Sequence, residues 1–200
     1  MSVEVVFETH STSEDNEAGI STGWLPGLLS ATGREQAREL GERRRHDGIA
    51  IVFTSDLRRA VETAEIAFAG SPLAVVPDAR LRECNYGKLN GTVGPAQDRA
   101  AHLDVPYPGG ESWREAVERV VGFLEELKRG HDQERVLVIG HVATRLALDC
   151  AANESRLEEL IGAPFSWQPG WDYVLPGPVL VTDTETCPVR ARPFRHAPHG

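Results

Sequence analysis

Short apolar runs alternate with longer segments of helical periodicity along most of the chain. Four runs rich in β-branched residues, at positions 3–7, 49–53, 73–76 and 136–139, are bounded by polar residues, Gly or Pro, a pattern that predicts buried parallel strands. Helical spacing recurs over 32–45, 57–69, 111–129 and 143–152, and Ser155 is expected to cap a further helix that reaches residue 161. Because strands and helices alternate, we expect a layered α/β/α fold with a largely parallel central sheet.

No feature of the sequence divides the chain into two domains. It has neither an internal repeat nor a low-complexity linker, which indicates one domain over residues 1–200. From residue 162 onward Pro and Gly accumulate, and residues 179–182 have the pattern of an edge strand. A Pro-rich tail from about residue 184 is expected to be loose.

The charge of the chain excludes some classes of partner. A formal net charge of −9 argues against a general nucleic-acid or anionic-membrane binder, because such proteins need a basic face to neutralise phosphates. An anionic substrate would therefore require a local positive pocket. The sequence leaves the oligomeric state open.

The cysteines and the first residues indicate a cellular compartment. Cys84, Cys150 and Cys187 are odd in number and far apart, which is not the pattern of a disulfide framework or a zinc site. The start of the sequence lacks a basic segment and a long apolar run, and no run approaches the ~20 residues of a membrane span. We expect a protein of the reducing cytoplasm.

Residues with useful chemistry follow three of the predicted strands. His10 comes after the first run, the segment 55–59 after the second, and His141 directly after the run at 136–139. In open α/β sheets, ligands bind beyond the carboxyl ends of the strands. A lone histidine at a strand end is usually structural, so the interpretation depends on its partners.

The first of these segments carries a family resemblance. The stretch VFETHSTSEDN resembles the signature of the histidine phosphatase (phosphoglycerate mutase-like) superfamily, in which a strand runs into Arg-His-Gly-x-Thr and an Asn follows. His10 occupies the His position and Asn16 the Asn position. Gly23, Trp24 and the segment 33–37 continue the match.

Later segments extend the resemblance in the order of the family. Residues 55–63 are similar to the family's Ser-x-Leu-x-Arg-Ala-x-x-Thr, with Arg59 rather than Arg58 in the phosphate-binding position. Residues 81–91 resemble the loop that carries the acidic proton donor, with Glu83 in that place. The Pro-Gly-Gly-Glu-Ser motif at 108–112 and the strand ending in His141 complete the series, and Arg145 matches a recurring arginine one turn later.

The resemblance implies a phosphomonoesterase acting on a small organic phosphate. His10 would attack phosphorus and form a phosphohistidine, while Arg59 and His141 stabilise the transferring group. Glu83 would donate a proton to the leaving oxygen and later activate water. This scheme needs no cofactor and no metal, and the histidines lack the spacing of common metal motifs.

The chain also departs from the family pattern near the expected nucleophile. Thr9 stands where the family has Arg, Ser11 replaces the following Gly, and Glu8 adds an acid that would repel phosphate or engage a cationic group if it pointed into the pocket. Val142 and Ala143 replace a Gly-rich continuation. The loss of one charged hydrogen bond is expected to cost roughly ten- to a hundredfold in transition-state binding.

Three explanations of these departures stay open. Another arginine, for example Arg145, replaces the missing guanidinium; the substrate supplies a positive group; or the phosphatase chemistry has been reduced or replaced. The residues expected to contact substrate beside the catalytic set are Thr9, Ser11, Asn16, Arg145 and Glu8. The alternative to a phosphomonoesterase is a weakened or repurposed relative that binds a phosphorylated ligand or performs non-hydrolytic chemistry. A mutase is less favoured, because the mutases that the sequence resembles carry a longer insertion where this chain has the short stretch 92–106.

Overall fold

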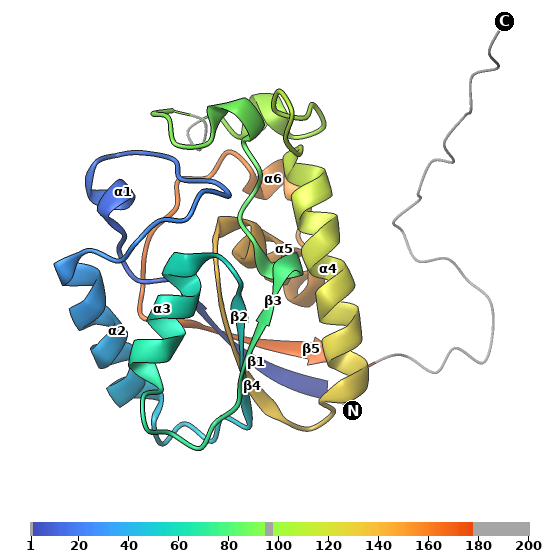
Figure 1. The fold of residues 1–200 in the computed structure, drawn as a ribbon. Helices are drawn as coiled ribbons and strands as arrows, with labels where there is room; N and C mark the ends of the chain where they lie inside the picture. The colour runs from blue at the N-terminus through green and yellow to red at the C-terminus, as the bar shows by residue number, and fades with distance from the viewer. Residues whose placement is uncertain (1, 95–97, 178–200) are drawn as a thin grey trace, which may run out of the picture.

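A twisted five-stranded sheet forms the centre of the molecule (Figure 1). The computed structural model describes residues 2–94 and 98–177. The strands lie in the order β3-β2-β4-β1-β5. All neighbours are parallel except β5, which runs antiparallel to β1. The strands are β1 (Ser2–Thr9), β2 (Ile51–Ser55), β3 (Val75–Asp78), β4 (Arg135–Gly140) and β5 (Trp171–Pro176).

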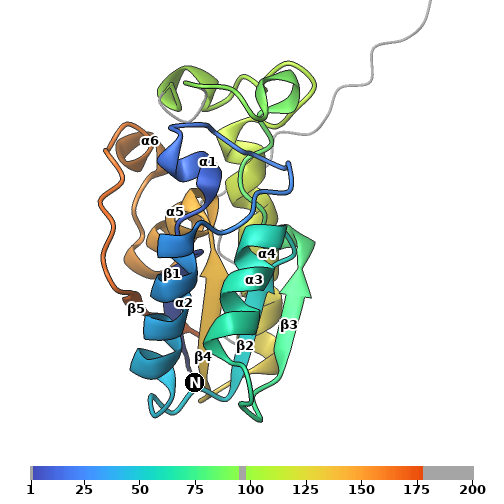
Figure 2. The same cartoon turned by 60° about the vertical axis from the view of Figure 1, so that its left-hand side comes forward.

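Helices cover both faces of the sheet (Figures 1 and 2). The pair α2 (Ala31–Arg44) and α3 (Arg58–Ala67) packs on one face, and the pair α4 (Trp113–Gly130) and α5 (Val142–Asn153) packs on the other. The short helices are α1 (Glu14–Glu17) and α6 (Leu157–Leu160), and the 3-10 turns are η1 (Ala79–Leu81), η2 (Gly87–Leu89) and η4 (Ala100–His102). The predicted layered α/β/α fold is therefore confirmed.

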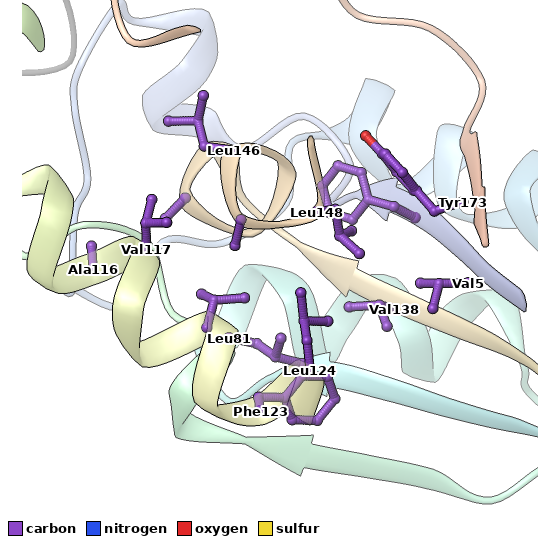
Figure 3. Packing of buried hydrophobic residues seen from close by; sticks show 14 of the residues in the cluster. Val5, Leu81, Ala116, Val117, Phe123, Leu124, Val138, Leu146, Leu148 and Tyr173 are labelled. Atoms are coloured by element: carbon purple, nitrogen blue, oxygen red, sulfur yellow. The ribbon is translucent and has the colours of Figure 1, made fainter. Parts of the chain in front are cut away.

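Successive side chains of β1 belong to two separate hydrophobic cores. Val5 and Phe7 belong to the larger core against α4 and α5, which Figure 3 shows around Leu124, Val138 and Leu148. Val6 belongs to the smaller core against α2 and α3. Successive side chains of a strand point to opposite faces, so residues 6 and 8 face α2 while residues 7 and 9 face away from it.

Two details of the predicted elements are wrong. The cap of α6 is Arg156, not Ser155, and its side chain makes no capping hydrogen bond. The edge strand β5 was not expected, although buried Trp171, Tyr173 and Leu175 alternate with exposed residues as in a half-buried strand. The strand expected at 179–182 and the tail from residue 184 lie outside the described residues.

Within the part of the chain that the structure describes, no helix is long and apolar enough to cross a bilayer.

Candidate active site

Two histidines meet at the carboxyl edge of the sheet. β1 and β4 are parallel neighbours in which Thr9 pairs with Gly140, so the residues that follow, His10 and His141, lie side by side. The backbone N–H of His10 donates to the Gly140 carbonyl at 3.0 Å, and the two imidazole centroids are 4.9 Å apart. Strand pairing therefore brings together two residues far apart in sequence.

Hydrogen bonds define which nitrogen of His10 carries its proton. Nδ1 lies 2.7 Å from the carbonyl oxygen of Ser11, which can only accept, so the proton is assigned to Nδ1. Nε2 keeps its lone pair and accepts the Nε–H of Arg59 at 3.2 Å. Burial, followed by the nearby Arg59 charge, lowers the pKa of His10 to about 3. The imidazole is therefore neutral at pH 7, as a nucleophile must be.

The opposite tautomer is assigned to His141. Nη2 of Arg59 lies 3.3 Å from Nδ1 of His141 and can only donate, which places the imidazole proton on Nε2. Burial lowers the pKa of His141 well below its usual value, and the charge of Arg59 adds to this effect. His141 Nε2 is buried and has no hydrogen-bond partner among the described residues. A buried N–H group without a hydrogen-bond partner is available to donate to a ligand.

Arg59 connects these two histidines to the mouth of the site. It is the second residue of α3 and only 3% exposed, and its Nη2 also donates to the Gly23 carbonyl at 3.0 Å. Thr63 fixes the local geometry, because its hydroxyl donates to the Arg59 carbonyl at 2.7 Å and accepts the Ser11 N–H at 3.0 Å. The neighbouring Arg58 is exposed and pairs with Glu65 at 3.2 Å.

Glu83 lies across the site on the loop after η1. Its Oε1 accepts the backbone N–H of Ala143 at 3.2 Å and its Oε2 accepts that of Val142 at 3.3 Å, both in the first turn of α5. The Glu83 carbonyl is held by Trp24 Nε1 at 2.6 Å and by Arg119 Nη2 at 3.3 Å. The Glu83 side chain is thus oriented by backbone N–H groups of α5, a helix that is far from Glu83 in the sequence but in direct contact with it.

A cavity of about 280 Å³ joins these groups. It is the size of a pocket for a small organic molecule. Its lining combines the four expected catalytic residues with Thr9 and Asn16, and further residues complete it: Thr12, Ile20, Ser21, Thr22, Gly23, Gln36, Tyr86, Val142, Phe165 and Trp167. The cavity therefore has a polar end at the histidines and large apolar side chains elsewhere in its wall.

Residues 6–166 match the family model of the histidine phosphatase superfamily (branch 1). The chain belongs to this superfamily. Phosphoserine phosphatase 1 of Hydrogenobacter thermophilus is 31% identical over 160 residues, which cover 74% of this chain and 75% of that protein. A 2,3-bisphosphoglycerate-dependent phosphoglycerate mutase of Methylobacterium sp. is 37% identical over 155 residues, covering 68% and 74%.

Solved structures of similar proteins agree with this membership. Bacillus stearothermophilus YhfR matches with a TM-score of 0.76 and 26% identity, over 86% of this chain and 90% of that chain. A mycobacterial glucosyl-3-phosphoglycerate phosphatase in complex with VO3 matches with a TM-score of 0.69 and 26% identity, over 78% and 84%. The superfamily member described here thus has relatives named as phosphatases and as mutases.

Three residues expected to contact substrate in this histidine phosphatase superfamily member do not line the cavity: Glu8, Ser11 and Arg145. Glu8 faces α2, where it is 2% exposed and pairs with Arg43 at 3.1 Å and Arg44 at 2.8 Å. The expectation that Glu8 points into the pocket is corrected, because strand alternation directs it to the opposite face from Thr9. Ser11 does not line the cavity, and its backbone instead binds Thr63 and His10.

Arg145 does not replace the missing guanidinium. Its Nε pairs with Asp149 at 2.9 Å, and its guanidinium lies 4.5 Å from the centroid of the Trp171 ring. It lines a second pocket, which shares only Val142 and Phe165 with the first. The explanation that another arginine replaces the missing guanidinium therefore does not hold for Arg145.

Sequence reasoning missed the aromatic part of the pocket. Phe165 and Trp167 lie in a Pro- and Gly-rich stretch that was interpreted only as a loop. The sequence pattern that could have identified them is a pair of aromatic residues two positions apart in a segment that otherwise has the composition of an exposed loop. Exposed aromatic residues on a loop are candidates for binding.

Within residues 2–94 and 98–177, no three His, Cys, Asp or Glu side chains are grouped so that they could hold a metal ion. The expectation of a metal-independent reaction stays a prediction, which retention of activity in EDTA would test.

Proposed function

We propose that this chain is a phosphomonoesterase that hydrolyses a small organic phosphate through a phosphohistidine on His10. The observation that carries the proposal is the pairing of tautomers: His10 offers a lone pair on Nε2, and His141 offers an unpartnered N–H beside it. A nucleophile and a charge-stabilising donor are the two groups that phosphoryl transfer needs within one small site.

In the first step, the Nε–H of Arg59 turns from His10 Nε2 to an oxygen of the bound phosphoryl group, and the freed Nε2 lone pair attacks phosphorus as the bond from phosphorus to the organic oxygen breaks. That oxygen takes the proton of a protonated Glu83, so the alcohol leaves neutral and a carboxylate remains. Arg59 and the His141 N–H bind the equatorial oxygens of the transferring group. The phosphorylated imidazole carries a positive charge, which the hydrogen bond from His10 Nδ1–H to the Ser11 carbonyl stabilises.

In the second step, a water molecule attacks the same phosphorus. The Glu83 carboxylate takes one proton from this water, the bond from nitrogen to phosphorus breaks, and its electron pair returns to His10 Nε2. Inorganic phosphate leaves, and both His10 and Glu83 return to their starting protonation states.

The test is release of phosphate from a panel of phosphomonoesters, with His10→Ala beside the wild type. We expect a loss of at least about a thousandfold, because the nucleophile itself is removed. His46→Ala changes an exposed histidine on the surface and serves as the matched control. Acid quench of the wild type should trap an acid-labile, alkali-stable phosphoryl group on the peptide that contains His10. Equal rates for His10→Ala and His46→Ala, or label on a Ser or Cys, would contradict the mechanism.

A second candidate is a weakened or repurposed relative that binds a phosphorylated ligand. Thr9 lines the cavity where the family resemblance leads us to expect Arg, and Arg59 is the one cationic side chain among the described lining residues. Thr9→Arg separates a weakened phosphatase from one that is specialised for a particular substrate. A weakened phosphatase should gain roughly ten- to a hundredfold in kcat/KM toward a generic aryl phosphate, whereas a specialised one should lose activity toward its own substrate.

A further inference from the structure

Two aromatic side chains form one wall of the cavity, and we call Phe165 and Trp167 the aromatic wall. They belong to the segment between α6 and β5, and both line the same cavity as His10. Phe165 is 40% exposed and Trp167 is 57% exposed. Large apolar side chains that stay exposed at the rim of a binding cavity are typical of a surface that a ligand covers.

The segment that carries the wall is attached at both of its ends. At the start, the Arg99 guanidinium donates to the carbonyls of Ile161, at 3.0 Å, and Ala163. At the end, Arg44 Nη2 donates to the Pro169 carbonyl at 3.4 Å. Gly170 has a φ of +86°, and a Cβ on it would lie 1.9 Å from Arg44 Nη2, so the chain can approach this closely only with glycine. The wall is thus held over the cavity.

The charges of the cavity limit what else a substrate can carry. Among the described lining residues, Arg59 is the only permanent cation and Glu83 the only acid. The Arg59 guanidinium binds the phosphoryl group, so a second anionic group on the substrate would have no cationic side chain in the cavity to pair with. The adjoining pocket contains two arginines whose guanidinium groups already have partners: Arg145 pairs with Asp149 at 2.9 Å, and Arg99 donates to the backbone carbonyls of Ile161 and Ala163. Substrates with an additional carboxylate or phosphate are therefore disfavoured.

We propose that the leaving group of the substrate is an uncharged, planar aromatic or heteroaromatic group that packs against Phe165 and Trp167. The inference rests on the proposed function for the position of the phosphoryl group. Ring stacking supplies the binding free energy that the cavity does not supply through a second cation. Phosphoserine and phosphoglycerate, which appear in the names of the relatives, each carry a carboxylate and are expected to bind poorly here.

Binding of phosphonates to the full chain tests this inference without turnover. Phenylphosphonate, methylphosphonate and phosphonoacetate present the same phosphonate with an aromatic ring, a methyl group or a carboxylate. We expect calorimetry to give about tenfold tighter binding of phenylphosphonate than of methylphosphonate, and no gain for phosphonoacetate. Equal binding of the phenyl and methyl compounds, or tightest binding of phosphonoacetate, would overturn the inference.

Variants then locate the preference on the wall. Trp167→Ala should reduce the ratio of phenylphosphonate to methylphosphonate affinity by roughly two- to tenfold, and Trp167→Phe should retain most of it. Val174→Ala is the matched control, because Val174 is 59% exposed on β5 and does not line the cavity. An unchanged ratio in Trp167→Ala overturns the inference. Failure of the proposed function is distinguishable, since it would appear as absent phosphate release with the phosphonate preference intact.

Discussion

The site has two regions that are built in different ways. The proposed phosphoryl-binding centre, which consists of His10, Arg59, Glu83 and His141, comes from strand ends, the first turn of a helix and a hydrogen-bonded loop. Arg59 and His141 are 3% and 2% exposed. The aromatic wall comes from a segment without regular secondary structure, and both of its side chains are at least 40% exposed.

This difference assigns chemistry and specificity to different parts of the fold. Reacting groups must be held within a fraction of an ångström, and sheet pairing with buried hydrogen bonds supplies that precision. Contacts to the leaving group tolerate looser positioning, and loops that differ among relatives can supply them. Variants of the centre should therefore affect turnover of every substrate, whereas variants of the wall should affect only some of them.

Glu83→Gln should have the largest effect and should sharpen this contrast. The amide keeps the size of the side chain and one oxygen for an N–H group of α5, but it cannot transfer a proton. Turnover of alkyl phosphates should fall roughly a hundred- to ten-thousandfold, and that of aryl phosphates with good leaving groups should fall much less. Steady-state rates over a series of leaving groups check this. A uniform loss would indicate that Glu83 acts in binding.

Arg59→Ala should follow, with a loss of roughly a hundred- to a thousandfold in kcat, because it removes the charged donor that contacts both histidines. Arg58→Ala is the matched control, since Arg58 precedes it, is exposed and pairs with exposed Glu65. Rates for several substrates should fall together in Arg59→Ala. Similar losses in the two variants would contradict the assignment of Arg59, rather than Arg58, to the phosphate-binding position at the start of α3.

The acid sensitivity of folding distinguishes the buried centre from the surface. The folded pKa of His10, about 3, lies below its unfolded value of 6.5, so the unfolded chain binds more protons between these values. Stability from this group is complete above the unfolded pKa and is lost as the pH falls towards the folded one. Between about pH 7 and about pH 5 the wild type should lose up to about 2 kcal/mol through His10.

Urea unfolding at the two pH values measures this loss. His10→Gln removes the linked proton, so its stability should fall less on acidification than that of the wild type. His46→Gln, on the surface, should behave like the wild type. The same acid loss in His10→Gln as in the wild type would show that His10 is not shielded in the folded chain.

Arg44→Lys should have the smallest effect, and it tests whether the wall depends on its attachment. The lysine keeps the charge beside Glu8 but loses the bond to the Pro169 carbonyl. Affinity for phenylphosphonate should fall about two- to fivefold, with methylphosphonate little changed. Arg43→Lys is the control, because Arg43 pairs with Glu8 and has no bond to that carbonyl. Equal effects of the two variants would show that the segment is positioned by other contacts.

Local patterns were enough to predict the architecture and the reacting residues. Apolar runs located β1 to β4 within two residues at each end, but the prediction that all four are buried is wrong for β3, which lies at the edge of the sheet and has no buried residue. The edge strand β5 escaped, because Gly and Pro precede it and only every second residue is buried. The sequence placed His10 and His141 after predicted strands, at the carboxyl edge of the sheet, but only the pairing of β1 with β4 brings the two residues side by side.

The sequence by itself determined the layered fold and the family resemblance and predicted the four residues of the proposed phosphoryl-binding centre, because each depends on periodicity or on a short motif. Only the tertiary structure decided which partners Glu8 has on α2, that Arg145 lies over the Trp171 ring in a second pocket, and that Phe165 and Trp167 reach the cavity of His10. These outcomes depend on contacts between different elements of the fold, such as the bond from Arg44 to the Pro169 carbonyl. Such contacts are fixed by how the whole chain packs, and no local pattern encodes them.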